Sequence, residues 1–167
     1  FVSGVELVDG TARLAAMNML LHGMGRANGP SPIEVRDGLT ADPGRRWSVV
    51  LANPPFGTKS SVTMIGDDGK KSKDNLEIVR DDFWVTTSNK QLNFVQHIRT
   101  MLKTTGMAAV VLPDNVLFEG GVGETVRKKL LETTDLHTIL RLPTGIFYAN
   151  GVKANVLFFD GKPSSKT

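Results

Sequence analysis

Short apolar runs alternate with stretches of helical spacing along most of the chain. The runs at residues 47–52 and 107–112 are continuous and rich in Val, Leu and Ala, which is typical of strands buried on both faces. Strands are expected at residues 1–7, 33–36, 47–52, 107–112, 136–142 and 152–160, and helices at residues 9–23, 91–103 and 124–132. This alternation predicts an α/β fold with a mostly parallel sheet.

The first predicted helix has a recognisable start and an apolar side. Asp9 is expected as its N-cap, and Leu14, Met17, Leu20 and Leu21 share a face at helical spacing.

The segment 58–90 interrupts the alternation. It is polar and has Gly66-Asp67-Asp68-Gly69 near its centre. Because its apolar residues follow neither the helical nor the strand period, we expect a long polar loop that acts as a lid or is disordered. We find no internal repeat and no domain boundary. Residues 1–160 are therefore expected to form one unit, with residues 161–167 as a tail or linker.

Composition excludes several classes of protein. The 167 residues, 40% hydrophobic and 22% charged, are ordinary for one globular domain or part of one. No apolar run reaches the roughly 18–20 residues of a membrane helix, so no membrane span is expected. The chain has no cysteine, and its three histidines lack ligand spacing, so we expect no metal site and a cytoplasmic location. A net charge of +3 is compatible with nucleic acid.

The sharpest chemical signal is Asn53-Pro54-Pro55-Phe56, directly after a predicted buried strand. In open α/β sheets, ligands bind beyond the carboxyl ends of the strands. The Asn53 amide oxygen and the Pro54 carbonyl could each accept one N–H of an exocyclic amine and so aim its lone pair at an electrophile. The two prolines would hold these acceptors rigid, and Phe56 could stack on a flipped base. The alternative is a plain proline-stiffened turn.

This motif resembles the catalytic motif of amino-methyltransferases, above all the adenine-N6 DNA methyltransferases. Further segments are similar to the modification (M) subunits of type I restriction systems. These segments are Gly4–Glu6, Leu14–Gly23, Leu112–Phe118, Arg141–Phe147, Gly151–Lys153 and Asn155–Phe159. The resemblance covers nearly the whole chain except the segment 58–90.

The resemblance implies a Rossmann-like S-adenosylmethionine-dependent methyltransferase fold whose last strand is antiparallel. It implies methyl transfer to the N6 amine of adenine in DNA, with Asn53, Pro54, Pro55 and Phe56 as the catalytic residues. Because the methyl group is attached to a sulfonium, a neutral thioether leaves readily, and positioning can supply most of the acceleration. The implied partners are DNA, a specificity (S) subunit, a restriction (R) subunit and a second M subunit.

The resemblance also implies residues that bind the cofactor S-adenosylmethionine. Glu6 matches the acidic residue that holds the ribose hydroxyls, which a carboxylate can accept in a fork. Asp37 matches the residue near the cofactor's adenine amine, Leu39 is expected to pack on that ring, and Asn53 lies beside the cofactor. The alternatives are a solvated Glu6 at a strand end and a turn role for Asp37.

The sequence departs from the family's pattern at its N-terminal side. The family's Gly-rich cofactor loop and the strand before it would precede Phe1 and are not in the sequence. Residues 1–160 are thus expected to be the C-terminal part of a methyltransferase catalytic domain and to be inactive alone. Since the absent strand is central in such sheets, we expect unpaired edges beside the strand at residues 1–7.

Two other functions are compatible with these residues. Asn-Pro-Pro-aromatic motifs also serve enzymes that methylate RNA bases or protein glutamine. A catalytically silent methyltransferase-like module that serves assembly is the second alternative. Retention of Asn53, Glu6 and Asp37 together favours an active parent protein over a silent one.

Overall fold

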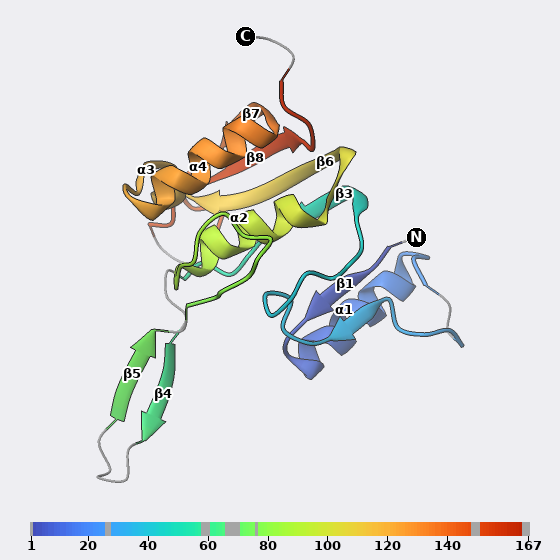
Figure 1. Ribbon diagram of the computed structural model, residues 1–167. Coiled ribbons are helices and arrows are strands. Elements are labelled where there is room, and N and C mark those ends of the chain that lie inside the picture. The colour runs from blue at the N-terminus through green and yellow to red at the C-terminus, as the bar shows by residue number, and fades with distance from the viewer. Residues whose placement is uncertain are drawn as a thin grey trace. The chain divides into compact units, whose positions relative to one another are not determined.

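A computed structural model describes residues 2–25, 28–57, 61–65, 71–75, 77–147 and 151–164. The chain divides into two compact units, residues 1–41 and residues 42–167, and each is described by itself (Figure 1). The assignment of residues 1–160 to one catalytic domain stays a prediction. None of the helices in the described ranges is long and apolar enough to cross a bilayer.

The first unit is a two-stranded parallel sheet with one helix. Strand β1 (Gly4–Glu6) pairs with β2 (Ile33–Val35), and Glu6 lies opposite Val35 at their carboxyl ends. Helix α1 (Asp9–Leu21) joins them. The expected cap is wrong by one residue: Val8 holds the N-cap position, and Asp9, already helical, forms an ion pair with Arg13 at 2.8 Å.

The apolar face of α1 is exposed in this structure. Leu14 and Leu21 are 68% and 83% exposed, and Met17 and Leu20 are exposed as well. The buried side chain of α1 is Ala12. Two three-residue strands can cover only a narrow strip of a helix, and the small Ala12 side chain allows the close approach there.

The second unit contains a four-stranded sheet in the order β3-β6-β8-β7. Its elements are β3 (Trp47–Ala52), α2 (Lys90–Met101), β6 (Leu102–Pro113), α3 (Asn115–Phe118), α4 (Val122–Thr133), β7 (Asp135–Arg141) and β8 (Ala154–Asp160). Strand β3 is parallel to β6, whereas β8 is antiparallel to both β6 and β7. The predicted antiparallel last strand is confirmed, and β3, β6 and β7 all run in one direction.

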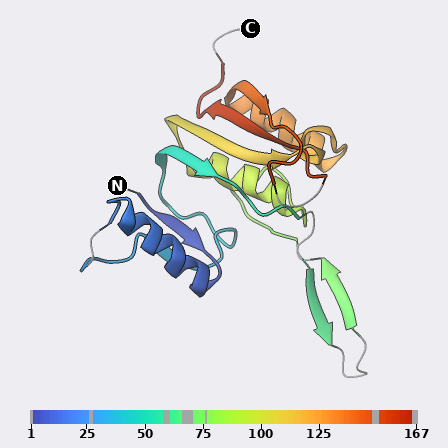
Figure 2. The ribbon, with the colours of Figure 1, turned by 180° about the vertical axis from the view of Figure 1, so that it is seen from behind.

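Helices α2 and α4 lie on the same face of this sheet (Figures 1 and 2). The core between helices and sheet consists of Val50, Leu92, Val95, Ile98, Leu102, Ala108, Val110, Leu112, Val116, Val126, Leu130, Leu157 and Phe159. The alternation of buried and exposed positions along β6 follows from this one-sided cover.

The opposite face of the sheet is apolar and exposed. Val49, Leu51 and Met107 are 53%, 78% and 56% exposed. In the described part of the chain, β3 is bonded only to β6 and β1 only to β2. The unpaired edges expected beside the strand at residues 1–7 are therefore present.

The prediction of an irregular loop over residues 58–90 is wrong in part. Strands β4 (Ser61–Ile65) and β5 (Lys71–Asn75) form an antiparallel hairpin, with Ser61 opposite Asn75. An isolated bridge joins Ile78 to Thr87. The sequence signal is weak because β5 is entirely polar. Gly66-Asp67-Asp68-Gly69, predicted near the centre of the loop, lies outside the described residues.

Candidate functional site

Several motifs meet at one edge of the four-stranded sheet. The parallel strands β3, β6 and β7 end there at Ala52, Pro113 and Arg141, and β8 begins there at Ala154. Helix α3 follows β6 at the same edge (Figure 1). Ligand sites of open α/β sheets lie at this carboxyl edge.

The segment Asn53-Pro54-Pro55-Phe56 leaves β3 at this edge. Pro54 is buried, while Asn53 and Pro55 are exposed. Among the described residues the Asn53 carboxamide has no hydrogen-bond partner, so its oxygen and nitrogen are available to a ligand. A buried Pro54 beside an exposed Asn53 anchors the backbone and leaves a polar group facing outward.

The ring of Phe56 has a neighbour from a distant part of the chain. Phe56 is 36% exposed, and its ring meets that of Phe147 edge to face, with centroids 5.1 Å apart and planes at 79°. This is a favourable geometry for an aromatic pair. The connection between β7 and β8 thereby supports the Asn-Pro-Pro-Phe motif.

Asp114, the residue after β6, joins two other strands. Its carboxylate accepts hydrogen bonds from Asn155 Nδ2 at 2.6 Å and from Arg141 Nη2 at 2.7 Å. The bond from Asn155, then that from Arg141, holds the pKa of Asp114 below its ordinary value. Asp114 is therefore a carboxylate at neutral pH, and it links the ends of β6, β7 and β8.

Side-chain amides fix the helices beside this edge. Asn89 caps α2 by accepting from the backbone N–H of Gln91 and Leu92, and its Nδ2 donates to Glu119 at 2.8 Å. Asn115 Nδ2 donates to Gln91 Oε1 at 2.9 Å. These bonds tie the start of α2 to α3, close to where β6 ends.

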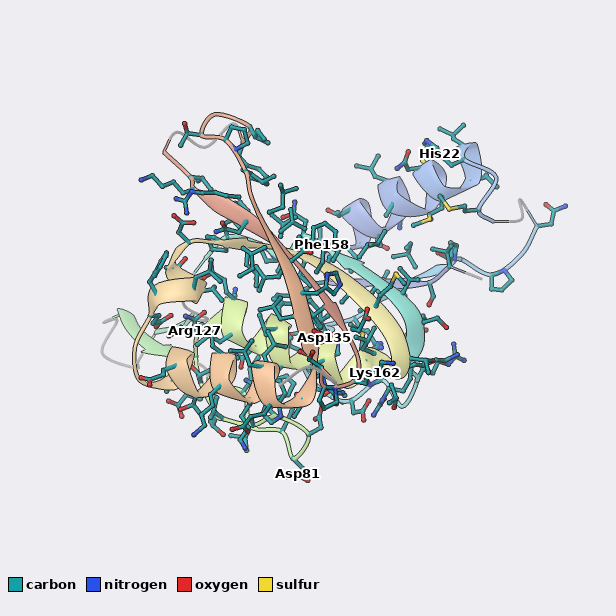
Figure 3. The ribbon with its side chains drawn as sticks, turned by 90° about the horizontal axis from the view of Figure 1, so that it is seen from above. His22, Asp81, Arg127, Asp135, Phe158 and Lys162 are labelled. Atoms are coloured by element: carbon teal, nitrogen blue, oxygen red, sulfur yellow. The ribbon has the colours of Figure 1, made fainter. Side chains whose placement is uncertain are left out.

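Arg127 on α4 (Figure 3) adds a further tie. Its Nη1 donates to the carbonyl oxygens of Val116 and Glu119 at 3.0 and 2.7 Å. Carbonyls at the end of a short helix lack partners within it, so this cation satisfies them. Helix α3 is thus held from two sides.

The acidic candidates lie in the first unit, at the carboxyl ends of its parallel strands. Glu6 Oε1 accepts from the Val8 backbone N–H at 2.9 Å. Asp37 Oδ1 accepts from the Leu39 backbone N–H at 2.8 Å, which is an Asx-turn. Each carboxylate keeps a second oxygen without a partner among the described residues. Leu39 is buried at 5% exposure.

The structure thus brings some predicted site residues together within each unit. Glu6 and Asp37 share one edge of the first unit, and Asn53 through Phe56 lie at the carboxyl edge of the second. The turn predicted as the alternative for Asp37 is present. Within the described ranges, no group of three or more His, Asp or Glu residues is arranged to hold a metal ion.

Two features of the site had no role assigned from the sequence. These are Phe147 beside Phe56 and the cluster of Asp114 with Arg141 and Asn155. Along the chain, Asp114 is 27 positions from Arg141 and 41 positions from Asn155. Phe56 and Phe147 are farther apart still. The motifs that contain them were visible in the sequence, but their contacts were not.

A sheet in which an antiparallel last strand lies between parallel neighbours, with a polar motif at its carboxyl edge, defines the Rossmann-like methyltransferase class. The chain belongs to the N-6 DNA methylase family, whose model matches residues 1–167.

Curated relatives are methylase subunits of type I restriction enzymes. The chain is 47% identical over 159 residues to the EcoKI methylase subunit of Escherichia coli K12, covering 93% of this chain and 27% of the relative. It is 26% identical to the MpnII methylase subunit of Mycoplasma pneumoniae, over 92% of this chain and 29% of the relative. The chain therefore spans about a quarter of the length of these relatives.

Solved structures agree with this family. The crystal structure of the EcoKI M protein matches with a TM-score of 0.78 and 46% identity, over 98% of this chain and 31% of that chain. A type I methyltransferase subunit from Streptococcus thermophilus matches with a TM-score of 0.74 and 29% identity, over 98% of this chain and 34% of that one. The fold extends across most of the present sequence.

Proposed function

We propose that the full-length protein transfers a methyl group from S-adenosylmethionine to the N6 amine of adenine in DNA. The observation that carries this proposal is the exposed Asn53 carboxamide, which has no partner in the described part of the chain, at the carboxyl end of β3. Similarity to type I methylase subunits supports the choice of DNA adenine as substrate.

The chain's own residues would act on the amine by orienting it. Asn53 Oδ1 accepts one N–H and the Pro54 carbonyl oxygen accepts the other, which holds the nitrogen with its lone pair directed at the methyl donor. Buried Pro54 and its neighbour Pro55 keep these acceptors in place before the base arrives. Phe56 stacks on the flipped adenine, which repays part of the cost of unstacking.

The carboxylates of the first unit fit the polar groups of the cofactor. Glu6 would accept hydrogen bonds from the ribose hydroxyls through its second oxygen, and Asp37 would accept from the adenine amine of the cofactor. Leu39 would pack on the adenine ring of the cofactor, and the family resemblance implies Asn53 as a further cofactor contact. When bound, S-adenosylmethionine supplies an electrophilic methyl group on a sulfonium.

The protein is proposed to work in a type I complex in the cytoplasm. Its partners there are a specificity subunit, a restriction subunit and a second modification subunit, as type I relatives suggest. The resemblance implies that the specificity subunit reads the DNA sequence. The modest net charge of +3 fits a chain that leaves much of the non-specific DNA affinity to other subunits.

The test uses the full-length protein with its specificity subunit. Labelled S-adenosylmethionine and duplex DNA are supplied, and the product is digested to nucleosides for wild type and Asn53→Ala. We expect label in N6-methyladenine that is lost in the variant. Unlabelled DNA with normal cofactor binding would point to an RNA or protein substrate, and absence of both would indicate a silent module.

A further inference from the structure

Asp114 occupies the N-cap position of α3 but does not cap it. Its side chain makes no hydrogen bond to the helix, and both carboxylate oxygens bond to other strands. Its backbone N–H donates to the Lys153 carbonyl at 3.0 Å. The side chain and the backbone N–H of Asp114 therefore bond to residues at the two ends of the connection between β7 and β8.

That connection is closed at its base by three sets of bonds. Arg141 lies opposite Asn155 in the ladder, and the Leu142 N–H donates to the Ala154 carbonyl at 3.0 Å. Asp114 bonds to the side chains of Arg141 and Asn155 and to the backbone of Lys153. We call these contacts of Asp114 the Asp114 clamp.

The clamped connection carries Phe147, whose ring meets Phe56. Neither ring belongs to a helix or strand, so neither is oriented by regular backbone bonds. The orientation of Phe56 depends on Phe147, and that of Phe147 depends on where the base of its connection is held.

We propose that Asp114 is a positioning residue for the target base. The Asp114 clamp holds Phe147 against Phe56 and so fixes the ring that faces the base bound by Asn53 and Pro54. This inference rests on the proposed function and deepens it, since Asp114 itself does not touch the base.

The charge and shape of the aspartate both matter to the clamp. Asn155 is 1% exposed, so its amide has no water to replace Asp114 as a partner. In Asp114→Asn one carboxylate oxygen becomes an NH2 group, which sets donor against donor at Arg141 or Asn155. In Asp114→Ala both bonds are lost.

The matched control is Asp135→Asn. Asp135 lies at the opposite end of β7 (Figure 3), and no hydrogen bond or ion pair of its side chain occurs among the described residues. The substitution is chemically the same, but it is distant from the site edge.

The test measures kcat, the KM for DNA and cofactor affinity in the full-length protein with its specificity subunit. We expect Asp114→Asn to lower kcat about tenfold, with cofactor affinity within about twofold of wild type. Phe147→Ala should have a similar effect, and adding Asp114→Asn to it should cost no more than about a further twofold. Asp135→Asn should behave as wild type.

Additive losses in the double variant, or a parallel loss of cofactor affinity, would overturn the proposal. So would an Asp114→Asn enzyme as active as wild type. A wild-type complex that forms no N6-methyladenine contradicts the proposed function instead, and hydrogen exchange then decides about the clamp. Asp114→Asn should reduce protection at the backbone amides of Asp114 and Leu142, which donate to Lys153 and Ala154 at the base of the connection, while Asp135→Asn should not. Unchanged protection in Asp114→Asn would refute the clamp.

Discussion

Gln96, in the middle of α2, holds Val85 by both of its backbone polar groups. Gln96 Oε1 accepts from the Val85 N–H at 3.0 Å, and Gln96 Nε2 donates to the Val85 carbonyl at 3.1 Å. Gln96 is 2% exposed. A side-chain amide thus takes the role of a neighbouring strand for the segment that leads into α2.

Replacing Gln96 should loosen that segment. Gln96→Leu leaves both polar groups of Val85 without partners, which costs about 2 kcal/mol. We expect hydrogen-exchange protection to fall at residues 83–89 and to persist in β6. In Gln96→Glu, protection should recover at low pH, because a protonated carboxyl can again donate to the Val85 carbonyl. Protection that does not change with pH in Gln96→Glu would contradict this role.

A second prediction concerns cofactor affinity. In Glu6→Gln an NH2 group replaces the carboxylate oxygen proposed to accept from ribose, while the bond to the Val8 N–H can remain. We expect S-adenosylmethionine to bind about ten- to a hundredfold more weakly to the full-length protein, measured by calorimetry. The control is Glu34→Gln, an exposed position on β2 whose carboxylate pairs with Arg36. Equal affinities in the two variants would remove Glu6 from the cofactor site.

Gly106 is predicted to be intolerant of any side chain. A Cβ there would lie 2.8 Å from the Trp47 carbonyl oxygen and 2.9 Å from Leu102 Cδ1. Gly106→Ala should therefore destabilise the pairing of β3 with β6 by about 1–3 kcal/mol. Gly120→Ala, where a Cβ meets no described atom within 4 Å, should change stability by less than about 0.5 kcal/mol. Exchange protection in β3 and β6 provides the measurement, and equal protection in both variants would be the contrary result.

The ion pair of Asp42 with Arg46 should stabilise the fold at neutral pH and lose this effect in acid. Hydrogen bonds from Arg46 to both carboxylate oxygens, each 2.8 Å, lower the pKa of Asp42 from 3.8 to about 2. Since the folded-state pKa is depressed, the stabilisation is complete above pH 4 and is lost as pH falls toward 2. Both side chains are about a third exposed or more, so the effect should stay below about 1 kcal/mol.

The test of this pair compares two adjacent arginines. Arg46→Gln should raise the pKa of Asp42 toward its ordinary value and shift acid unfolding upward in pH. Arg45→Gln removes the same charge from a side chain without an ion pair in the described part of the chain. If the two variants unfold at the same pH, the net charge of the protein and not the Asp42–Arg46 ion pair governs its stability in acid.

Sequence reasoning succeeded where one periodicity dominates. The continuous apolar run 47–52 became β3 without a change of boundary, because two prolines end the run and prevent the strand from continuing. The burial expected on both faces is wrong, since Val49 and Leu51 are exposed on the face that no helix covers. Strand β7 starts and ends one residue earlier than predicted, and β8 starts two residues later than predicted. The position of Asn53 at a strand end followed from the same pattern.

Predictions from the sequence failed for polar strands, for very short helices and for contacts between distant residues. The hairpin of β4 and β5 was missed because β5 has no apolar side chain to mark it. The four-residue helix α3 is too short to show helical periodicity. The Asp114 clamp requires knowledge of which strands are neighbours, and that depends on where β8 enters the sheet.

The position of β8 also sets the order in which this unit can fold during synthesis. Strand β7 is bonded only to β8 among the described strands, although β7 precedes it in the chain. Until residue 160 has left the ribosome, β7 therefore has no partner in the sheet and Asp114 has no Asn155 to bind. The edge that carries Asn53 is thus completed by β8, the last of the described strands in chain order, so a nascent chain that stalls before β8 holds the Asn-Pro-Pro-Phe motif without the Asp114 clamp beside it.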